Sequence, residues 1–138
     1  MPLAADLSRR RRTFQYAHDQ TNPGGEVDVL DPAGYGSVVI TKSINIINEG
    51  VGVVGVLAYA ITINASATSS VVLRGLTIEG SSVGANGIEF LAGGPLKIMN
   101  CLVQGFVGGS NTAGNGILID PQHWNSRYHD HRYDGWEQ

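Results

Sequence analysis

Three of the four histidines in this chain lie close together near its C-terminal end. His123, His129 and His131 fall within residues 121–138, with Asp130 and Asp134 beside them. Imidazole nitrogens and carboxylate oxygens are ligands for zinc and similar ions, and the H-x-H spacing suits two ligands on one side of an extended strand. The spacing matches no established zinc motif. One interpretation is therefore a divalent metal held by the three histidines, and the rest of the chain predicts no required cofactor.

The same segment carries an unusual set of aromatic residues. It contains both tryptophans of the chain, together with Tyr128 and Tyr133, and it has no Ala, Val, Ile, Leu, Met or Phe. Aromatic rings stack on sugars, and they also cover apolar surface at the end of a repetitive domain. Tyr128 and Trp136 are therefore candidate binding residues, with a capping role as the alternative.

Four charged residues in the middle of the chain form a second candidate site. Arg74, Glu79, Glu89 and Lys97 alternate with apolar residues, which places them on the outside of strands. They either contribute to a binding surface or keep a sheet soluble. Asp28 and Asp31 are also acidic, but the sequence DVLD is typical of an ordinary strand end followed by an Asp turn.

A repeat indicates which elements position these residues. NGIEF (86–90) returns as NGILI (115–119), and VVLRGLTIEG (71–80) aligns with LKIMNCLVQG (96–105). The two copies of the Asn-Gly repeat lie farther apart in the sequence than the two copies of the longer repeat, because a longer loop precedes NGILI. Equal strands joined by unequal loops are typical of a solenoid.

Short β-branched runs divide the chain into three parts. We expect a flexible, Arg-containing leader over 1–23, a repetitive body over 24–120 and a His/Trp/Tyr-rich tail over 121–138. Runs of Val and Ile between Gly, Asn and Ser predict the strands of the body. These strands are 26–30, 37–40, 43–47, 52–57, 60–64, 71–74, 76–79, 87–91, 96–99, 101–104 and 116–119.

Two all-β architectures fit these strands. Asn86-Gly87 and Asn115-Gly116 suit the hairpin turns of an antiparallel sandwich. The repetition instead favours a parallel β-helix, in which Gly75 and Asn100 occupy the same corner and tolerate left-handed backbone angles. We predict an all-β fold, a short right-handed parallel β-helix of about four to five coils, the hand following from the rule for parallel crossovers.

Alternation along the strands predicts which side chains fill the interior. Apolar residues at every second position of each strand point to one face of a sheet. The expected inward residues are Val38, Ile40, Ile44, Ile46, Ile61, Ile63, Val71, Leu73, Leu76, Ile78, Ile88, Phe90, Leu96, Ile98, Cys101, Val103, Ile117 and Ile119.

These residues carry a resemblance to a known group of proteins. GGEVDVLDPAGYGSVVITKSINIINEG, followed by VVLRGLTIEG, NGIEFLAGG and LKIMNCLVQGF, resembles bacterial right-handed parallel β-helix repeat proteins of the pectate-lyase-like superfamily. The resemblance covers roughly residues 24–120. It implies a truncated member, because the leader does not match the usual segment that caps the first coil and the coils stop after NGILID. The catalytic constellations of lyases and hydrolases on this fold find no match in these residues.

Composition excludes several classes of partner. The net charge of −3 offers no general attraction to nucleic acid, and one cysteine, Cys101, permits no internal disulfide. No secretion signal is recognisable, and the longest apolar run, 51–61, is too short to span a membrane. The localisation is therefore open.

Three classes of function follow from these observations. The first is a noncatalytic structural or binding module, self-associating, with a polysaccharide as one ligand. The second is a carbohydrate-active enzyme, a polysaccharide lyase or hydrolase, and the third is a truncated domain that mainly self-associates. We expect a homo-oligomer, a trimer or dimer, packed along low-charge faces that include Val39, Val54, Leu57, Tyr59 and Val72.

Overall fold

The chain folds into short strands and a single short helix over the residues described by the structure. The computed structural model describes residues 13–31, 33–49, 53–55, 59–80, 86–108 and 114–121. Their elements are α2 (Phe14–Gln20), β1 (Gly25–Val29), β2 (Val38–Ile40), β3 (Ile44–Asn48), β4 (Val53–Gly55), β5 (Tyr59–Asn64), β6 (Val71–Arg74), β7 (Thr77–Glu79), β8 (Asn86–Ala92), β9 (Leu96–Met99), β10 (Leu102–Gln104) and β11 (Asn115–Ile119). Every predicted strand is present, with small shifts at its ends, which confirms the all-β class.

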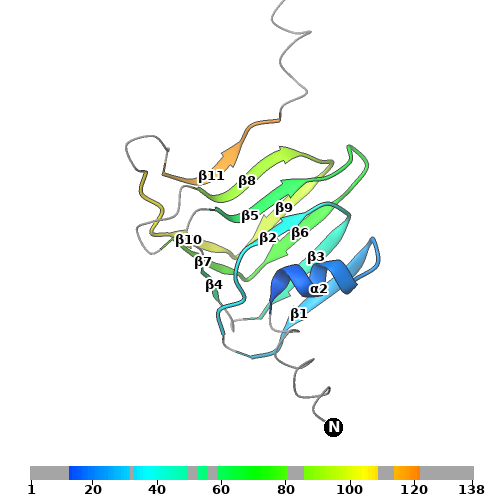
Figure 1. The fold of residues 1–138 in the computed structure, drawn as a ribbon, viewed down its shortest axis with the longest axis horizontal. Coiled ribbons are helices and arrows are strands. Elements are labelled where there is room, and N and C mark those ends of the chain that lie inside the picture. The colour runs from blue at the N-terminus through cyan, green and yellow to red at the C-terminus, as the bar shows by residue number, and fades with distance from the viewer. Residues whose placement is uncertain are drawn as a thin grey trace, which may run out of the picture.

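The strands form three parallel sheets around one apolar core (Figure 1). The β1 sheet has the order β1-β3-β6-β9, the β2 sheet has the order β2-β5-β8-β11, and the β4 sheet has the order β4-β7-β10. From β3 onward the chain visits the β1, β4 and β2 sheets in turn and then repeats the cycle. We call each level of the stack a rung, so that β9, β10 and β11 make up the fourth rung.

Parallel pairing explains the repeated sequence. Val71 pairs with Leu96 and Asn86 pairs with Asn115, so both sequence repeats stack in register on adjacent rungs. The Nδ2 of Asn115 donates a hydrogen bond of 3.2 Å to Oδ1 of Asn86. The two Asn-Gly dipeptides therefore begin strands, and the antiparallel hairpin alternative is wrong.

The core consists mainly of the inward residues of the first three rungs, with Phe14 of α2 and Phe106 beyond β10 also buried in it. Their alternation with outward residues is regular, as in β3, where Ile44, Ile46 and Asn48 are buried and the intervening residues are partly exposed. Burial of each Ile or Leu side chain contributes about 1.5–3 kcal/mol. The buried residues that were predicted are Val38, Ile40, Ile44, Ile46, Ile61, Ile63, Val71, Leu73, Leu76, Ile78 and Ile88.

Burial decreases toward the fourth rung. Phe90 and four predicted inward residues of β9, β10 and the intervening corner are only partly buried, while Ile117 is 45% and Ile119 is 64% exposed. Ile117 and Ile119 align with Ile88 and Phe90, so they face the expected way. Their exposure has a separate cause, because no described strand stacks on β11.

A tight corner connects the β1 sheet to the β4 sheet. Gly75 and Asn100 occupy equivalent positions on successive rungs and have positive φ values of 71° and 51°, as predicted. The buried Asn48 lies one rung below, and its Nδ2 donates a hydrogen bond of 2.9 Å to the carbonyl oxygen of Gly75. This amide fixes the spacing of the second and third rungs at the corner.

Helix α2 packs against β1 and β2 at the first rung (Figure 1). Thr13 caps the helix, because its Oγ1 accepts a hydrogen bond of 3.1 Å from the backbone N–H of Tyr16. Phe14 and His18, one helical turn apart, form its buried face, and the Phe14 ring lies 5.0 Å from that of Tyr35. Part of the leader expected over 1–23 therefore forms a helix that packs on the first rung, while residues 1–12 lie outside the described part.

No helix in the described residues could cross a membrane. Helix α2, with seven residues, lacks both the length and the apolar composition that a spanning segment requires.

Candidate functional site

The outer face of the β1 sheet combines acidic and basic side chains from three rungs. Glu26 and Asp28 are exposed on β1, because the alternate residues Val27 and Val29 pack toward the core. The parallel register places Asp28 beside Ile47 of β3, and Ile47 beside Arg74 of β6. Carboxylates and a guanidinium group therefore lie on one face, with an apolar residue between them.

These residues line a hollow of about 380 Å³, which we call the acidic groove. Its volume lies within the range of about 300–1,000 Å³ that is usual for small-molecule sites. A second hollow of about 430 Å³ shares Glu49 and Arg74 with the groove and reaches the corner at Asn48, Gly75 and Asn100. The lining residues of the acidic groove are Glu26, Asp28, Val29, Leu30, Ile47, Glu49 and Arg74.

The two carboxyl groups of β1 interact with each other. A hydrogen bond with Asp28 raises the pKa of Glu26, and the negative charge of Asp28 and partial desolvation raise it further. One proton bound between two carboxyl groups relieves the repulsion of their charges. The raised pKa means that Glu26 keeps its proton to higher pH than an isolated glutamate, and the protonated carboxyl group can donate a hydrogen bond.

A pH-dependent stability difference is expected for Glu26→Gln. Because the folded-state pKa of Glu26 is raised above its ordinary value of 4.5, its stabilising effect is present below that value and is lost as pH rises through the raised pKa. Glu26→Gln should therefore gain stability relative to the native chain between about pH 4 and about pH 7. Urea unfolding across this range measures the difference.

The control for this measurement is Glu89→Gln, which removes a carboxylate from β8 in another sheet. Glu89→Gln should show no comparable gain over the same pH range. An equal gain in both variants would mean that overall net charge, and not the pair of Glu26 with Asp28, is responsible.

The groove has the chemistry to bind a hydroxyl-rich ligand. The carboxylates accept hydrogen bonds from hydroxyl groups, and the guanidinium of Arg74 donates hydrogen bonds to their oxygens. Ile47 and Leu30, the latter 82% exposed, offer apolar surface to the C–H face of a sugar ring. Among the described residues, no group of three or more His, Cys, Asp or Glu side chains is arranged to hold a metal ion.

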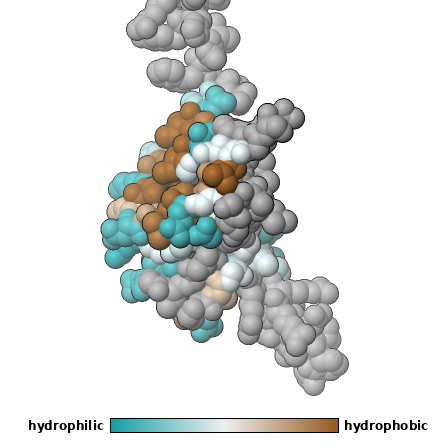
Figure 2. All heavy atoms as spheres, turned by 90° about the vertical axis from the view of Figure 1, so that its left-hand side faces the viewer, coloured by the Kyte–Doolittle hydropathy of each residue, from teal (hydrophilic) through white to brown (hydrophobic). Residues whose placement is uncertain are grey.

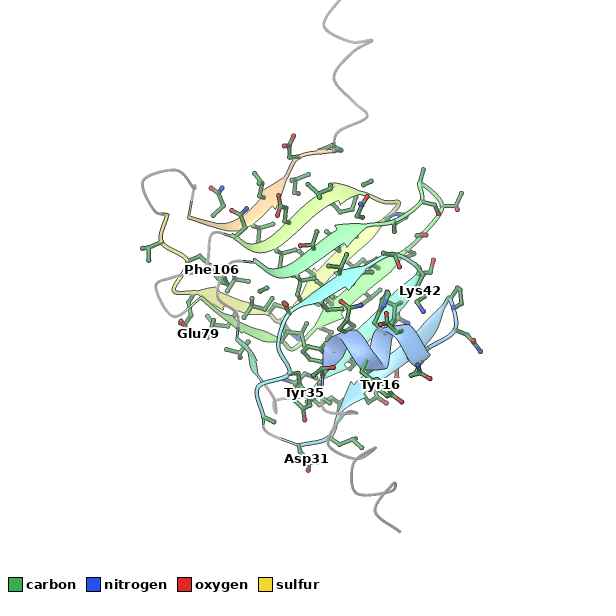
Figure 3. The ribbon with its side chains drawn as sticks, viewed as in Figure 1. Tyr16, Asp31, Tyr35, Lys42, Glu79 and Phe106 are labelled. Atoms are coloured by element: carbon green, nitrogen blue, oxygen red, sulfur yellow. The ribbon has the colours of Figure 1, made fainter. Side chains whose placement is uncertain are left out.

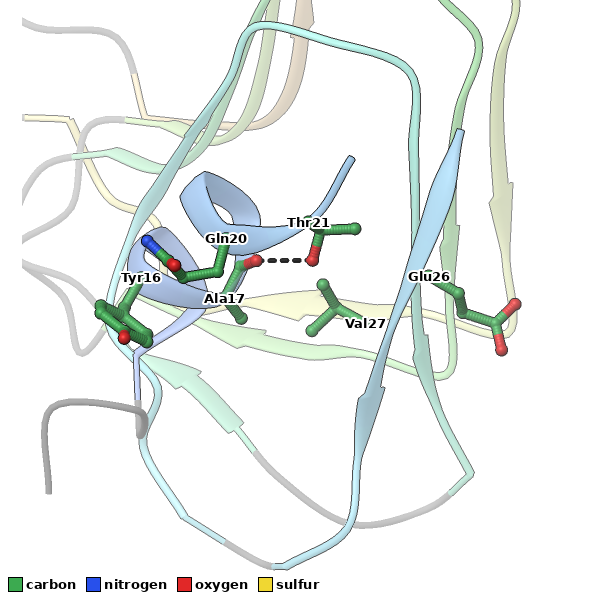
Figure 4. Close-up of a pocket in the computed structure, with 6 residues that line it drawn as sticks. All are labelled: Tyr16, Ala17, Gln20, Thr21, Glu26 and Val27. Atoms are coloured by element: carbon green, nitrogen blue, oxygen red, sulfur yellow. Dashed lines mark hydrogen bonds between the residues drawn. The ribbon is translucent and has the colours of Figure 1, made fainter. Parts of the chain in front are cut away.

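A further hollow of about 330 Å³ lies between α2 and β1 (Figure 4). Figure 4 shows Tyr16 and Gln20 on the helix side, while the carboxylate of Glu26 points away from them. The hydroxyl of Thr21 already donates a hydrogen bond of 2.6 Å to the carbonyl oxygen of Ala17. This hollow therefore offers fewer polar groups for a ligand than the acidic groove.

His18 and Asp19 form a pair of residue types that often takes part in catalysis. The Nδ1 of His18 lies 2.9 Å from Oδ1 of Asp19, and hydrogen bonds from His18 and then Gln15 lower the pKa of Asp19. The Nε2 of His18 accepts a hydrogen bond of 3.2 Å from the backbone N–H of Thr41. Because both ring nitrogens hold partners within the fold, the pair attaches α2 to the first rung.

The structure does not gather the four charged residues predicted for the body. Arg74 and Lys97 are exposed on the β1 sheet, but Glu79 belongs to the β4 sheet and Glu89 to the β2 sheet. All four point outward, as predicted. Oε2 of Glu79 accepts a hydrogen bond of 2.6 Å from Gln104, and Figure 3 shows Glu79 on the opposite side of the molecule from Lys42.

The remaining predicted site residues belong to the tail. His123, His129 and His131, proposed as metal ligands, and Tyr128 and Trp136, proposed for binding, lie outside the described residues.

Sequence reasoning missed Glu26 and Glu49 and assigned Asp28 only a structural role. One available signal was the spacing of Glu26 and Asp28, two positions apart on a strand and therefore on one face. Their connection to Arg74 required the register between β1, β3 and β6, which the visible repeats do not include.

Comparison of the chain with family models, with curated proteins and with solved structures yields no match.

Proposed function

We propose that the chain is a short right-handed parallel β-helix of the pectate-lyase-like kind, with about four coils in its described part. Three parallel sheets visited in cyclic order support this, as does the single core that they enclose. Right-handed connection is the rule for parallel strands of one sheet. The sequence of residues 24–120 supports the family resemblance.

On this scaffold, we propose a noncatalytic module that binds a polysaccharide in the acidic groove. The observation that carries the proposal is the alignment of Glu26, Asp28 and Arg74 on one face across three rungs. Neighbouring strands lie about 4.8 Å apart, so the carboxylates of β1 and the guanidinium of Arg74 are two strand spacings apart, with Ile47 between them. A chain of sugar residues can contact both polar ends and the apolar surface between them.

The sequence matches no catalytic constellation of the lyases or hydrolases on this fold, which favours binding over glycoside hydrolysis. A carbohydrate-active enzyme remains the second candidate, because Glu26, whose raised pKa suits a proton donor or acceptor, lines the same groove as Arg74.

Arg74→Ala should weaken binding by about ten- to hundredfold, because a hydrogen bond to a charged group contributes about 1.5–3 kcal/mol. The full chain is titrated against a panel of neutral and uronic-acid polysaccharides, with and without divalent cations, and affinity is measured by calorimetry. Release of unsaturated or reducing ends is followed in the same samples. Such release would favour the enzyme candidate.

The matched control is Lys97→Ala, which removes the same charge from the same sheet outside the acidic groove. Its affinity should stay within about twofold of the native value. Equal losses in both variants would indicate general attraction by positive charge, and an absence of binding across the panel would contradict the proposal.

A further inference from the structure

The fourth rung leaves the interior of the stack uncovered within the described residues. Among the described strands, β9, β10 and β11 each have a neighbour on only one side, so no described strand pairs with the other edge of each. Ile117 is 45% and Ile119 is 64% exposed at this end, and Leu102 and Val107 extend the apolar surface to the outside of the stack. Figure 2 shows the apolar side chains gathered toward the end of the molecule where β11 lies.

The fourth rung carries almost no charge, so it can contact the fourth rung of a second copy without electrostatic repulsion. β10 and β11 contain no charged residue, and the one charged residue of β9, Lys97, points outward. Two copies that meet through this end therefore do not bring like charges together at the centre of the contact. Apolar and uncharged contacts of this kind suit a symmetric interface.

The opposite end differs, because helix α2 covers part of it. Phe14 and His18 are each 2% exposed against the first rung. Head-to-tail stacking would require displacement of this helix, and such stacking would also continue into an open fibre. The arrangement of the two ends therefore favours contact between identical ends.

We propose that two copies of this chain associate through their fourth rungs, about a two-fold axis perpendicular to the stack. The longest edge strand, β11, pairs antiparallel with β11 of the second copy, centred on Ile117. This arrangement places the interior of one stack against that of the other, with β9 opposite β10 of the second copy. The backbone N–H and C=O groups at the edge of β11 then form hydrogen bonds with the second copy, and Ile119 is covered.

The size of the end sets the expected affinity. The strands of the fourth rung have four, three and five residues, fewer in total than the roughly 20–30 residues per side of a standard stable interface. We therefore expect a dimer that dissociates in the micromolar range. A concentration series can then resolve both species.

Sedimentation equilibrium of the full chain from about 1 to 200 μM tests the proposal. The mass should rise from the 14.6 kDa of one chain to twice that value and then remain constant. A monomer throughout would contradict the proposal and would indicate that another part of the same chain covers this end. A mass that keeps rising would also contradict it, because it would indicate open stacking.

Ile117→Lys should weaken dimerisation by at least tenfold, and Ile119→Lys provides a second variant at a more exposed position. Val39→Lys is the matched control, because Val39 is 46% exposed on the outside of β2 in the first rung. The control should dimerise like the native chain. If Val39→Lys alone disrupts association, the copies pack along their sides and the proposed interface is wrong.

Cys101 provides a readout that requires no substitution. This thiol is the one cysteine of the chain and is partly exposed in the fourth rung. Its rate of reaction with a thiol reagent should fall several-fold as concentration rises through the dimerisation range. A rate that does not change while the mass doubles would exclude this end as the interface.

Discussion

Replacement of Gly75 by alanine should largely prevent folding. An added Cβ would lie 1.7 Å from the backbone oxygen of Asn48, and φ at Gly75 is +71°, where L-residues are disfavoured. The contact is with backbone, so no side-chain rotation relieves it. We expect destabilisation of more than about 4 kcal/mol, a large part of the 5–15 kcal/mol that stabilises a typical domain. Urea unfolding monitored by circular dichroism provides the measurement.

Two variants separate the contact from the backbone angle. Gly36 has φ of +73° with no atom within 4 Å of an added Cβ, so Gly36→Ala should cost only about 1–2 kcal/mol. Asn100→Gly retains the corner on the next rung and should change stability by about 1 kcal/mol or less. If Gly75→Ala and Gly36→Ala lose the same amount of stability, the contact with the Asn48 backbone does not cause the loss at Gly75.

Truncation of Phe14 to alanine should destabilise the domain by about 3–5 kcal/mol. Its side chain is 2% exposed, it contacts the ring of Tyr35, and its backbone N–H donates a hydrogen bond of 3.0 Å to the Tyr35 carbonyl oxygen. A helix of seven residues is unstable alone, so this packing determines whether α2 forms. Calorimetric and urea unfolding of Phe14→Ala measure the loss.

Tyr16→Ala provides an aromatic control on the same helix. Tyr16 is only partly buried, so we expect a cost below about 1 kcal/mol. Equal losses in the two variants would indicate that helix propensity, rather than packing of Phe14 on the first rung, stabilises α2.

The strands were predictable because their signal is local. Alternation of apolar residues along each short run, as in β3 and β8, decides which side chains turn inward. The two sequence repeats, 71–80 with 96–105 and 86–90 with 115–119, also match the observed pairings of the last two rungs. The exposure of Ile117 could not be predicted in this way, because alternation indicates the direction of a side chain and not whether another layer covers it.

The acidic groove depends on information that the repeats do not contain. Gly25 pairs with Ile44, and Ile44 pairs in turn with Val71 across a longer stretch of chain. These unequal intervals hide the alignment of Asp28 with Arg74 unless the loops are first removed. Helix α2 was missed for a different reason, because a seven-residue helix presents only one pair of buried residues, Phe14 and His18.

The pairing of each rung with its immediate neighbours has a consequence for how the chain folds. Every strand pair in the described residues joins adjacent rungs, and none joins the first rung directly to the fourth. Each pairing joins strands about 25 positions apart in the sequence, and such non-local pairings are typical of slow-folding β proteins. Each new level nevertheless requires closure of only one loop, whose entropic cost rises slowly with its length. Folding should therefore propagate from level to level, with its rate set by the first two levels to pair.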